Sequence, residues 1–209
     1  MDHTPKLTVL RIPTRVLLIA TCLATIFNLT AQENRAESLS RVHNENGGYT
    51  VMVSSSWVLT ETVGKGSYLA VFREEGGEPD LNSYSLEIRR IINWNEELGL
   101  KAKRAKQATI EYANLVANRL AASAEGDKTV FVINAGKEYY GMDLYYFHIV
   151  APVDGQDCTA MRLLAGITRR DWFHALWKIP CGELEQHYPD VTRMRGSLRV
   201  ETKWKAKSR

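Results

Sequence analysis

Four strand-like runs follow one another closely in the second half of the chain. They are rich in β-branched, aromatic and other apolar residues, and they cover residues 130–134, 142–150, 159–168 and 172–179. Short segments that carry Gly, Asp and Arg separate the runs, and Pro180 ends the last one. This spacing predicts an antiparallel meander.

The first half of the chain adds strands and the clearest helix. Strand patterns cover residues 49–53, 58–62 and 68–72, and the alternation over 83–93 is typical of a half-buried strand. Residues 96–123 form one helical region, in which Ile110, Ala113, Ala117 and Leu120 recur on one face. A second helix is predicted over 181–194, either continuous or split by Pro189 into two short turns, before a closing strand at 197–200. The fold class is therefore α+β.

The amino terminus carries the pattern of a secretory signal peptide. Lys6, Arg11 and Arg15 precede an apolar run that ends in Leu29-Thr30-Ala31, so we expect residues 1–31 to be a signal peptide. The run has about 14 to 16 residues without a charge, whereas a membrane-spanning helix needs about 20. Cleavage is thus favoured over a permanent anchor. A lipid anchor on Cys22 is disfavoured, because Thr21 replaces the small residue expected before it.

Cleavage would leave one domain in a periplasmic or secreted protein, with no membrane span after processing. Removing 31 of 209 residues leaves 178, and the leader's net +2 lowers the formal charge from +3 to +1. That charge predicts no nucleic-acid partner. We expect residues 32–46 to be a flexible lead-in, residues 47–201 a single domain and residues 202–209 a basic tail.

Cys158 and Cys181 remain after processing, and an even pair in an exported chain indicates a disulfide. If runs 159–168 and 172–179 form a hairpin centred between Arg169 and Arg170, opposed residue numbers sum to 339, as 158 and 181 do. The two cysteines would then face each other at the open end of the hairpin. Two separate buried thiols are the alternative.

No catalytic, cofactor-binding or metal-ligating pattern stands out. His148 and His174 lie on predicted strands without the spacing of metal ligands. Asp143, Asp154 and Asp157 border one loop but lack EF-hand spacing. Neither a nucleophile elbow nor a Walker A loop occurs. We therefore predict no cofactor, no metal and no enzymatic activity.

Aromatic and arginine side chains give the candidate binding surface. Tyr, Trp and Arg supply most of the anchors in protein interfaces. Core packing is the favoured interpretation for any single ring, and the rings that stay exposed beside the arginines would form the protein-binding patch. The candidate binding residues are Tyr145, Phe147, Arg162, Arg169, Arg170 and Trp172.

The order of these elements resembles the PsbP-like superfamily over residues 47–200. The matching features are a Gly-led opening strand, a turn into Trp57, the runs 69–72 and 85–88, one amphipathic helix, a meander, and a closing Ser197-Leu198-Arg199-Val200. The family includes the photosystem II extrinsic subunit, a Ran-binding import factor and DcrB-type envelope proteins. The resemblance implies an α/β/α sandwich with a central antiparallel sheet and two main helices. It also implies binding to partner proteins rather than catalysis.

This chain departs from the family at two points, which leave its subfamily open. Serines at 54–56 replace the Pro often found before the Trp, and the family does not require the cysteine pair. We expect Trp57 and Ser197 to be structural, and the resemblance carries over no catalytic residue.

The sequence thus predicts an exported, non-enzymatic domain of the bacterial envelope that binds another protein. A sharper form is an immunity or inhibitor protein that neutralises an effector or a hydrolase. The alternatives are a small-ligand or lipid-binding periplasmic protein and a hydrolase whose site pairs His148 or His174 with an acid and a Ser.

The export prediction is tested on the purified product. We expect its chain to begin at Gln32 and to carry one bond between Cys158 and Cys181. The intact mass shows at which residue the chain begins. A gain of two hydrogens on reduction shows that the chain carries one disulfide. An unprocessed chain in the cytosol with both late thiols free would contradict the prediction.

Overall fold

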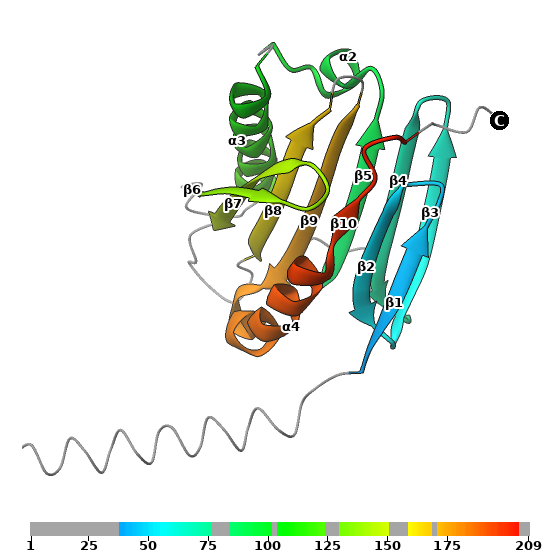
Figure 1. The fold of residues 1–209 in the computed structure, drawn as a ribbon. Coiled ribbons are helices and arrows are strands. Elements are labelled where there is room, and N and C mark those ends of the chain that lie inside the picture. The colour runs from blue at the N-terminus through cyan, green and yellow to red at the C-terminus, as the bar shows by residue number, and fades with distance from the viewer. Residues whose placement is uncertain are drawn as a thin grey trace, which may run out of the picture. The chain divides into compact units, whose positions relative to one another are not determined.

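The computed structural model describes residues 38–76, 84–101, 104–123, 130–150, 159–168 and 171–204 (Figure 1). The predicted signal peptide, Cys158, Arg169 and Arg170 lie outside the described residues, as does the side chain of Cys181. The disulfide therefore stays a prediction.

An antiparallel sheet of seven strands forms the centre of the fold, in the order β3-β4-β5-β9-β8-β7-β6. This confirms the α+β class and the central antiparallel sheet. The strands are β3 (Trp57–Gly64), β4 (Ser67–Glu74), β5 (Ser85–Ile91), β6 (Phe131–Tyr139), β7 (Asp143–Val150), β8 (Thr159–Ile167) and β9 (Trp172–Pro180).

The meander forms in the predicted register. In the β8–β9 hairpin, Thr159 lies opposite Pro180 and Ile167 lies opposite Trp172, so opposed residue numbers sum to 339. Strand β6 is longer than predicted, and its register with β7 shifts between Asn134 and Gly136. This shift is a β-bulge, which adds a residue to one strand of the pair.

One face of the sheet packs against helix α3 (Ala105–Ser123). The predicted helix face is correct, since Ala113, Ala117 and Leu120 are buried against the sheet. The prediction of one helical region over 96–123 is wrong. A short helix α2 (Trp94–Leu98) ends at Gly99, whose φ of 66° places it in the left-handed region that glycine adopts without strain.

The opposite face of the sheet is covered by a helix and, beside it, a small second sheet, instead of by a helix alone. Helix α4 (Leu184–Ser197) follows a 3-10 turn η1 (Cys181–Glu183) and stays continuous through Pro189. Beside it lies a three-stranded sheet in the order β1-β2-β10. Its strands are β1 (Leu39–Asn44), β2 (Tyr49–Ser54) and β10 (Arg199–Val200).

The small sheet corrects two predictions. Residues 39–44 of the expected flexible lead-in pair with β2 along their whole length, so the folded unit begins earlier than residue 47. Strand β5 was expected to be half-buried, but both of its faces are covered. Leu86 and Ile88 pack toward α4 and the small sheet, whereas Ile91 packs toward α3.

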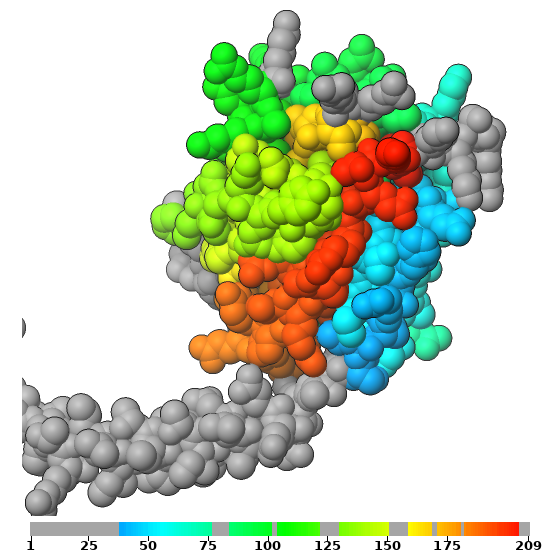
Figure 2. All heavy atoms as spheres, viewed as in Figure 1, coloured from blue at the N-terminus to red at the C-terminus, as the bar shows by residue number. Residues whose placement is uncertain are grey.

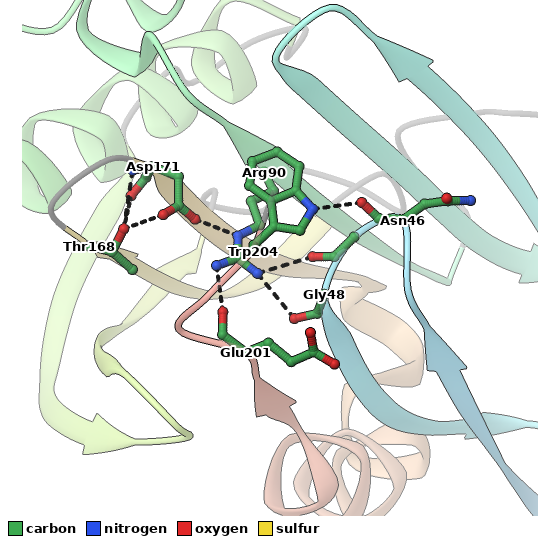
Figure 3. A network of polar contacts seen from close by, with 8 residues as sticks. Asn46, Gly48, Arg90, Thr168, Asp171, Glu201 and Trp204 are labelled. Atoms are coloured by element: carbon green, nitrogen blue, oxygen red, sulfur yellow. Dashed lines mark hydrogen bonds and ion pairs between the residues drawn. The ribbon is translucent and has the colours of Figure 1, made fainter. Parts of the chain in front are cut away.

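The Arg90 guanidinium on β5 joins segments that are far apart in the chain (Figure 3). Its side chain is completely buried, and its Nε forms an ion pair with Asp171. Its Nη1 donates to the carbonyl oxygens of Gly47 (3.2 Å) and Gly48 (3.1 Å), and its Nη2 donates to that of Glu201 (2.6 Å). One side chain thus connects the β1–β2 turn, the β8–β9 hairpin and the C-terminal segment.

Trp204 and Thr168 complete this network. The Trp204 ring lies 4.8 Å from the Arg90 guanidinium carbon, and its Nε1 donates to the carbonyl of Asn46 at 2.7 Å. Thr168 bonds the Asp171 carboxylate and accepts from its backbone N–H. Trp204, the third residue of the expected basic tail at 202–209, is therefore held against the folded unit by these contacts.

Gly48 permits the close approach of this turn to Arg90. Its φ of 61° lies in the left-handed region, and a Cβ there would come within 2.7 Å of Arg90 Nη1. Two constraints therefore require glycine at this position.

Removing Asp171 should destabilise the fold strongly. The Asp171→Ala variant leaves the Arg90 charge buried without its counter-ion, which costs about 3–5 kcal/mol. Urea denaturation measures the loss.

The matched control is Glu97→Ala, which breaks the more exposed Arg89–Glu97 pair and costs about 1 kcal/mol or less. Replacing both charges, in Arg90→Met/Asp171→Leu, should recover part of the loss. Equal losses for Asp171→Ala and Glu97→Ala would contradict this role for Arg90.

Candidate functional site

The structure separates the predicted binding residues. Phe147 and Trp172 are buried in the core beneath α3, so they are not available to a partner. Tyr145 packs partly against the same core. The expectation that these rings form an exposed patch is therefore wrong for Phe147 and Trp172, because α3 covers the face on which they lie.

Arg162 lies on the other face of the sheet. Along β8, the side chains of Met161 and Leu163 pack toward α3, so Arg162 between them points toward α4. Only 6% of its surface is exposed. The ring of Tyr188 on α4 lies 5.9 Å from the Arg162 guanidinium carbon.

The register across three strands places exposed apolar side chains on the same face of the sheet as Arg162, with His148 between them. His148 on β7 is opposite both Ile133 on β6 and Arg162 on β8, so these side chains share one face of the sheet. Ile133 and Phe131 are 56% and 57% exposed, and Tyr188 is 45% exposed. We call Phe131, Ile133 and Tyr188 the β6 shelf. Figure 2 shows the β6–β7 hairpin, in yellow-green, beside orange α4 on the viewed face.

Further along α4, a second arginine contacts the same strands. The Arg195 guanidinium carbon lies 4.4 Å from the centre of the Tyr146 ring, and its Nη1 lies 3.4 Å from a carboxylate oxygen of Glu138. The His148 ring packs edge-on against Tyr146 at 4.7 Å. Burial, together with the nearby charges of Arg162 and Arg195, lowers the pKa of His148.

His174 belongs to a separate buried network beneath α3. The indole N–H of Trp172 donates to its Nδ1 at 2.9 Å, so the proton of the neutral ring lies on Nε2. That nitrogen is 3.2 Å from a Glu87 oxygen and 3.4 Å from the Tyr112 hydroxyl. The partners of His174 found in the described part of the chain are thus Trp172, Glu87 and Tyr112, and the ring of His148 contacts Tyr146.

Sequence reasoning did not single out Phe131, Ile133 or Tyr188. The strand 130–134 was predicted, and Phe131, Val132 and Ile133 are apolar on both of its faces. Its place as the first strand of the meander is the signal that could have pointed to an edge position. Tyr188 lies within the helix predicted over 181–194. Its position beside Arg162 depends on how that helix crosses the sheet, which the sequence does not show.

Metal and membrane features were searched over the described residues. Within those ranges, no group of three or more His, Cys, Asp or Glu side chains could hold a metal ion. No helix of the described part is long and apolar enough to cross a membrane.

Comparison with known proteins gives a likeness of fold. No protein-family model matches the chain, and no curated protein matches it at a significant level. The chain is similar to the solution structure of cyanobacterial PsbP (CyanoP) from Synechocystis sp. PCC 6803, with 11% identity and a TM-score of 0.47. The match covers 79% of this chain and 94% of that one. The likeness says nothing of what the chain binds.

The His174 network predicts a pH-dependent stability. Burial lowers the pKa of His174 from 6.5, although Glu87 opposes the shift while Arg89 and Lys178 reinforce it. The unfolded chain therefore binds a proton at a higher pH than the folded one. Between the lowered pKa and 6.5, the free energy of unfolding falls with decreasing pH, by up to about 1.4 kcal/mol per pH unit.

Urea denaturation between about pH 7.5 and about pH 5 measures this slope, which His174→Gln should reduce. The control is His43→Gln, at an exposed histidine on β1, which should keep the wild-type slope. Identical slopes in the wild type and His174→Gln would contradict the assignment of a neutral, buried His174.

Proposed function

We propose that this chain is an exported, non-enzymatic domain that binds another protein along the open edge of strand β6. The observation that carries the proposal is the exposure of large apolar side chains on this strand. Phe131 and Ile133 are more than half exposed, and Tyr139 is 75% exposed. Exposed apolar groups on an edge strand are typical of a surface that a partner covers.

The edge position supplies hydrogen-bonding groups as well as apolar area. Strand β6 is the last in the sheet order, so no strand of the described residues pairs with the side of its backbone that faces away from β7. The ladder with β7 is regular from Phe131 to Asn134, before the bulge. An extended segment of another protein could pair there as an added strand, the mode called β-augmentation.

The opposite edge of the sheet is less suited to this role. Strand β3 exposes Val58 and Leu59 to 38% and 39%, and Thr60, Glu61 and Thr62 follow directly. Such polar and charged residues protect an edge from pairing. The β6 edge is therefore the better candidate, and β3 provides an internal control.

The finer form of the proposal is that the partner is an effector or a hydrolase that this chain neutralises in the periplasm. The predicted signal peptide at residues 1–31 supports the compartment. The apolar shelf beside an open edge supports an extended apolar segment as the part of the partner that binds.

Site-specific photocrosslinking in the native cells tests the docking edge. A photoreactive phenylalanine analogue at position 131 should form an adduct whose mass exceeds that of the chain by one polypeptide. Ile133→Lys should reduce the yield about tenfold, because it places a charge in the apolar contact. The substitution is exposed and should change stability by about 0.5 kcal/mol or less.

The matched controls lie on strand β3. The analogue at position 58 should give no adduct, and Leu59→Lys should leave the yield at position 131 unchanged. Equal yields at both edges would refute the proposal. An adduct of twice the chain's own mass would also refute it, since the partner would be a second copy.

A further inference from the structure

The β1–β2 turn carries Asn46-Gly47, the one Asn-Gly pair in the chain. Such a pair can react with itself, because the backbone nitrogen of the glycine lies within reach of the side-chain carbonyl carbon of the asparagine. The glycine has no Cβ to hinder this approach. Asparagine is for this reason among the residues that limit the lifetime of a protein. The pair is therefore a candidate modification site.

The fold requires the glycine of this pair, whereas its described contacts do not involve the asparagine side chain. A Cβ on Gly47 would lie 2.5 Å from ring atoms of both Tyr49 and Tyr68, so a larger residue would clash with both rings. The backbone of Asn46 does not have the positive φ at which asparagine is favoured. The contact of Asn46 found within the described residues is that of its carbonyl oxygen with Trp204. Its side chain points away from the polar network (Figure 3).

The turn restrains the reaction while the chain is folded. The nitrogen that must attack belongs to Gly47, and its N–H donates to Oδ1 of Asn44 at 2.7 Å in a buried hydrogen bond. The carbonyl groups on both sides of this nitrogen are held as well. That of Asn46 accepts from Trp204 at 2.7 Å, and that of Gly47 accepts from Arg90 at 3.2 Å. The nitrogen therefore reaches the asparagine side chain only when the turn opens locally.

We propose that Asn46 is a deamidation site whose rate is set by opening of the Arg90 network. In the open turn, the Gly47 nitrogen gives its proton to hydroxide and forms a bond to Cγ of Asn46. The bond from Cγ to Nδ2 breaks, and Nδ2 takes a proton from water and leaves as ammonia. The product is a cyclic succinimide. Water then opens this ring at either carbonyl carbon, which gives aspartate or isoaspartate.

Isoaspartate would change the turn that fixes the small sheet. Its peptide bond runs through the side-chain carboxyl group, so it adds one carbon to the main chain before Gly47 and leaves a free carboxylate at position 46. The added carbon displaces the carbonyl groups of Gly47 and Gly48 from the Arg90 guanidinium that binds them. The modification thus turns a transient opening of the network into a permanent loosening of the small sheet.

The test follows Asn46 in the folded chain at mildly alkaline pH, well below the melting temperature. Peptide mapping by mass spectrometry separates the asparagine, aspartate and isoaspartate forms. Trp204→Phe keeps an aromatic ring beside Arg90 but loses the bond to the Asn46 carbonyl. It should speed the conversion about fivefold, the equivalent of one hydrogen bond of about 1 kcal/mol. Asn44→Ala frees the Gly47 N–H and should speed the conversion at least as much.

Control variants separate local opening from general loss of stability. Ile149→Val removes a buried methyl group beneath α3, so it destabilises the fold without touching the turn and should leave the rate unchanged. Asn46→Gln should stop the conversion, because its longer side chain must close a larger ring. The isolated isoaspartate form should melt below the unmodified chain. Asn46→Asp adds the charge without lengthening the backbone, so it should melt close to the unmodified chain.

Faster conversion in Trp204→Phe and Asn44→Ala, with the wild-type rate in Ile149→Val, supports the proposal. The proposal is overturned if neither turn variant converts faster than the wild type or if Ile149→Val converts as fast as they do. It is also overturned if the isoaspartate form melts as the unmodified chain does. The β6 edge takes no part in this reaction, so the proposed function and the deamidation site can fail separately.

Discussion

The buried Arg90–Asp171 pair is the interaction on which the assembly of this fold depends. The two strands that carry or adjoin these residues, β5 and β9, are neighbours in the central sheet, but the other acceptors of Arg90 come from the β1–β2 turn and from the residue after β10. Three strands of the small sheet are thereby fixed against the face of the large one. A buried charge that donates to four acceptors on separate segments has one arrangement of lowest energy, so the pair specifies where the small sheet lies as well as holding it there.

The parts of the fold that sequence predicts well are those set by local signals. Alternation and turn residues place the strands of the meander, and the spacing of the β8–β9 hairpin determines its register to the residue. The parts that it misses depend on contacts between distant segments. Strand β1 is polar at Ser40, Arg41 and His43, and nothing in those residues shows that β2 pairs with them. Arg90 alternates with Leu86 and Ile88 and so shares their face, but its partner Asp171 is 81 residues away.

The candidate site shows the same limit. Alternation tells which side chains share a face of a strand, but not which element covers that face. Phe147 and Trp172 were expected at a surface and lie under α3, whereas Phe131 and Ile133 on the edge strand stay more than half exposed. Arg162 was selected with the aromatic residues as an interface anchor. The structure places it beside the Tyr188 ring, and most of its own surface is buried.

Arg90 and Arg162 lie on the same side of the central sheet, and they differ in how many segments of the fold each one connects. An apolar side chain of similar length could fill either space without the cost of desolvating a charge. At Arg90, that substitution would disconnect the turn, the hairpin and the C-terminal segment. At Arg162, it would remove one bond to Met161, the preceding residue, and the contact with the Tyr188 ring on α4. The charge of Arg90 is therefore explained by the fold that it holds together. The charge of Arg162 connects no comparable set of segments within the described chain.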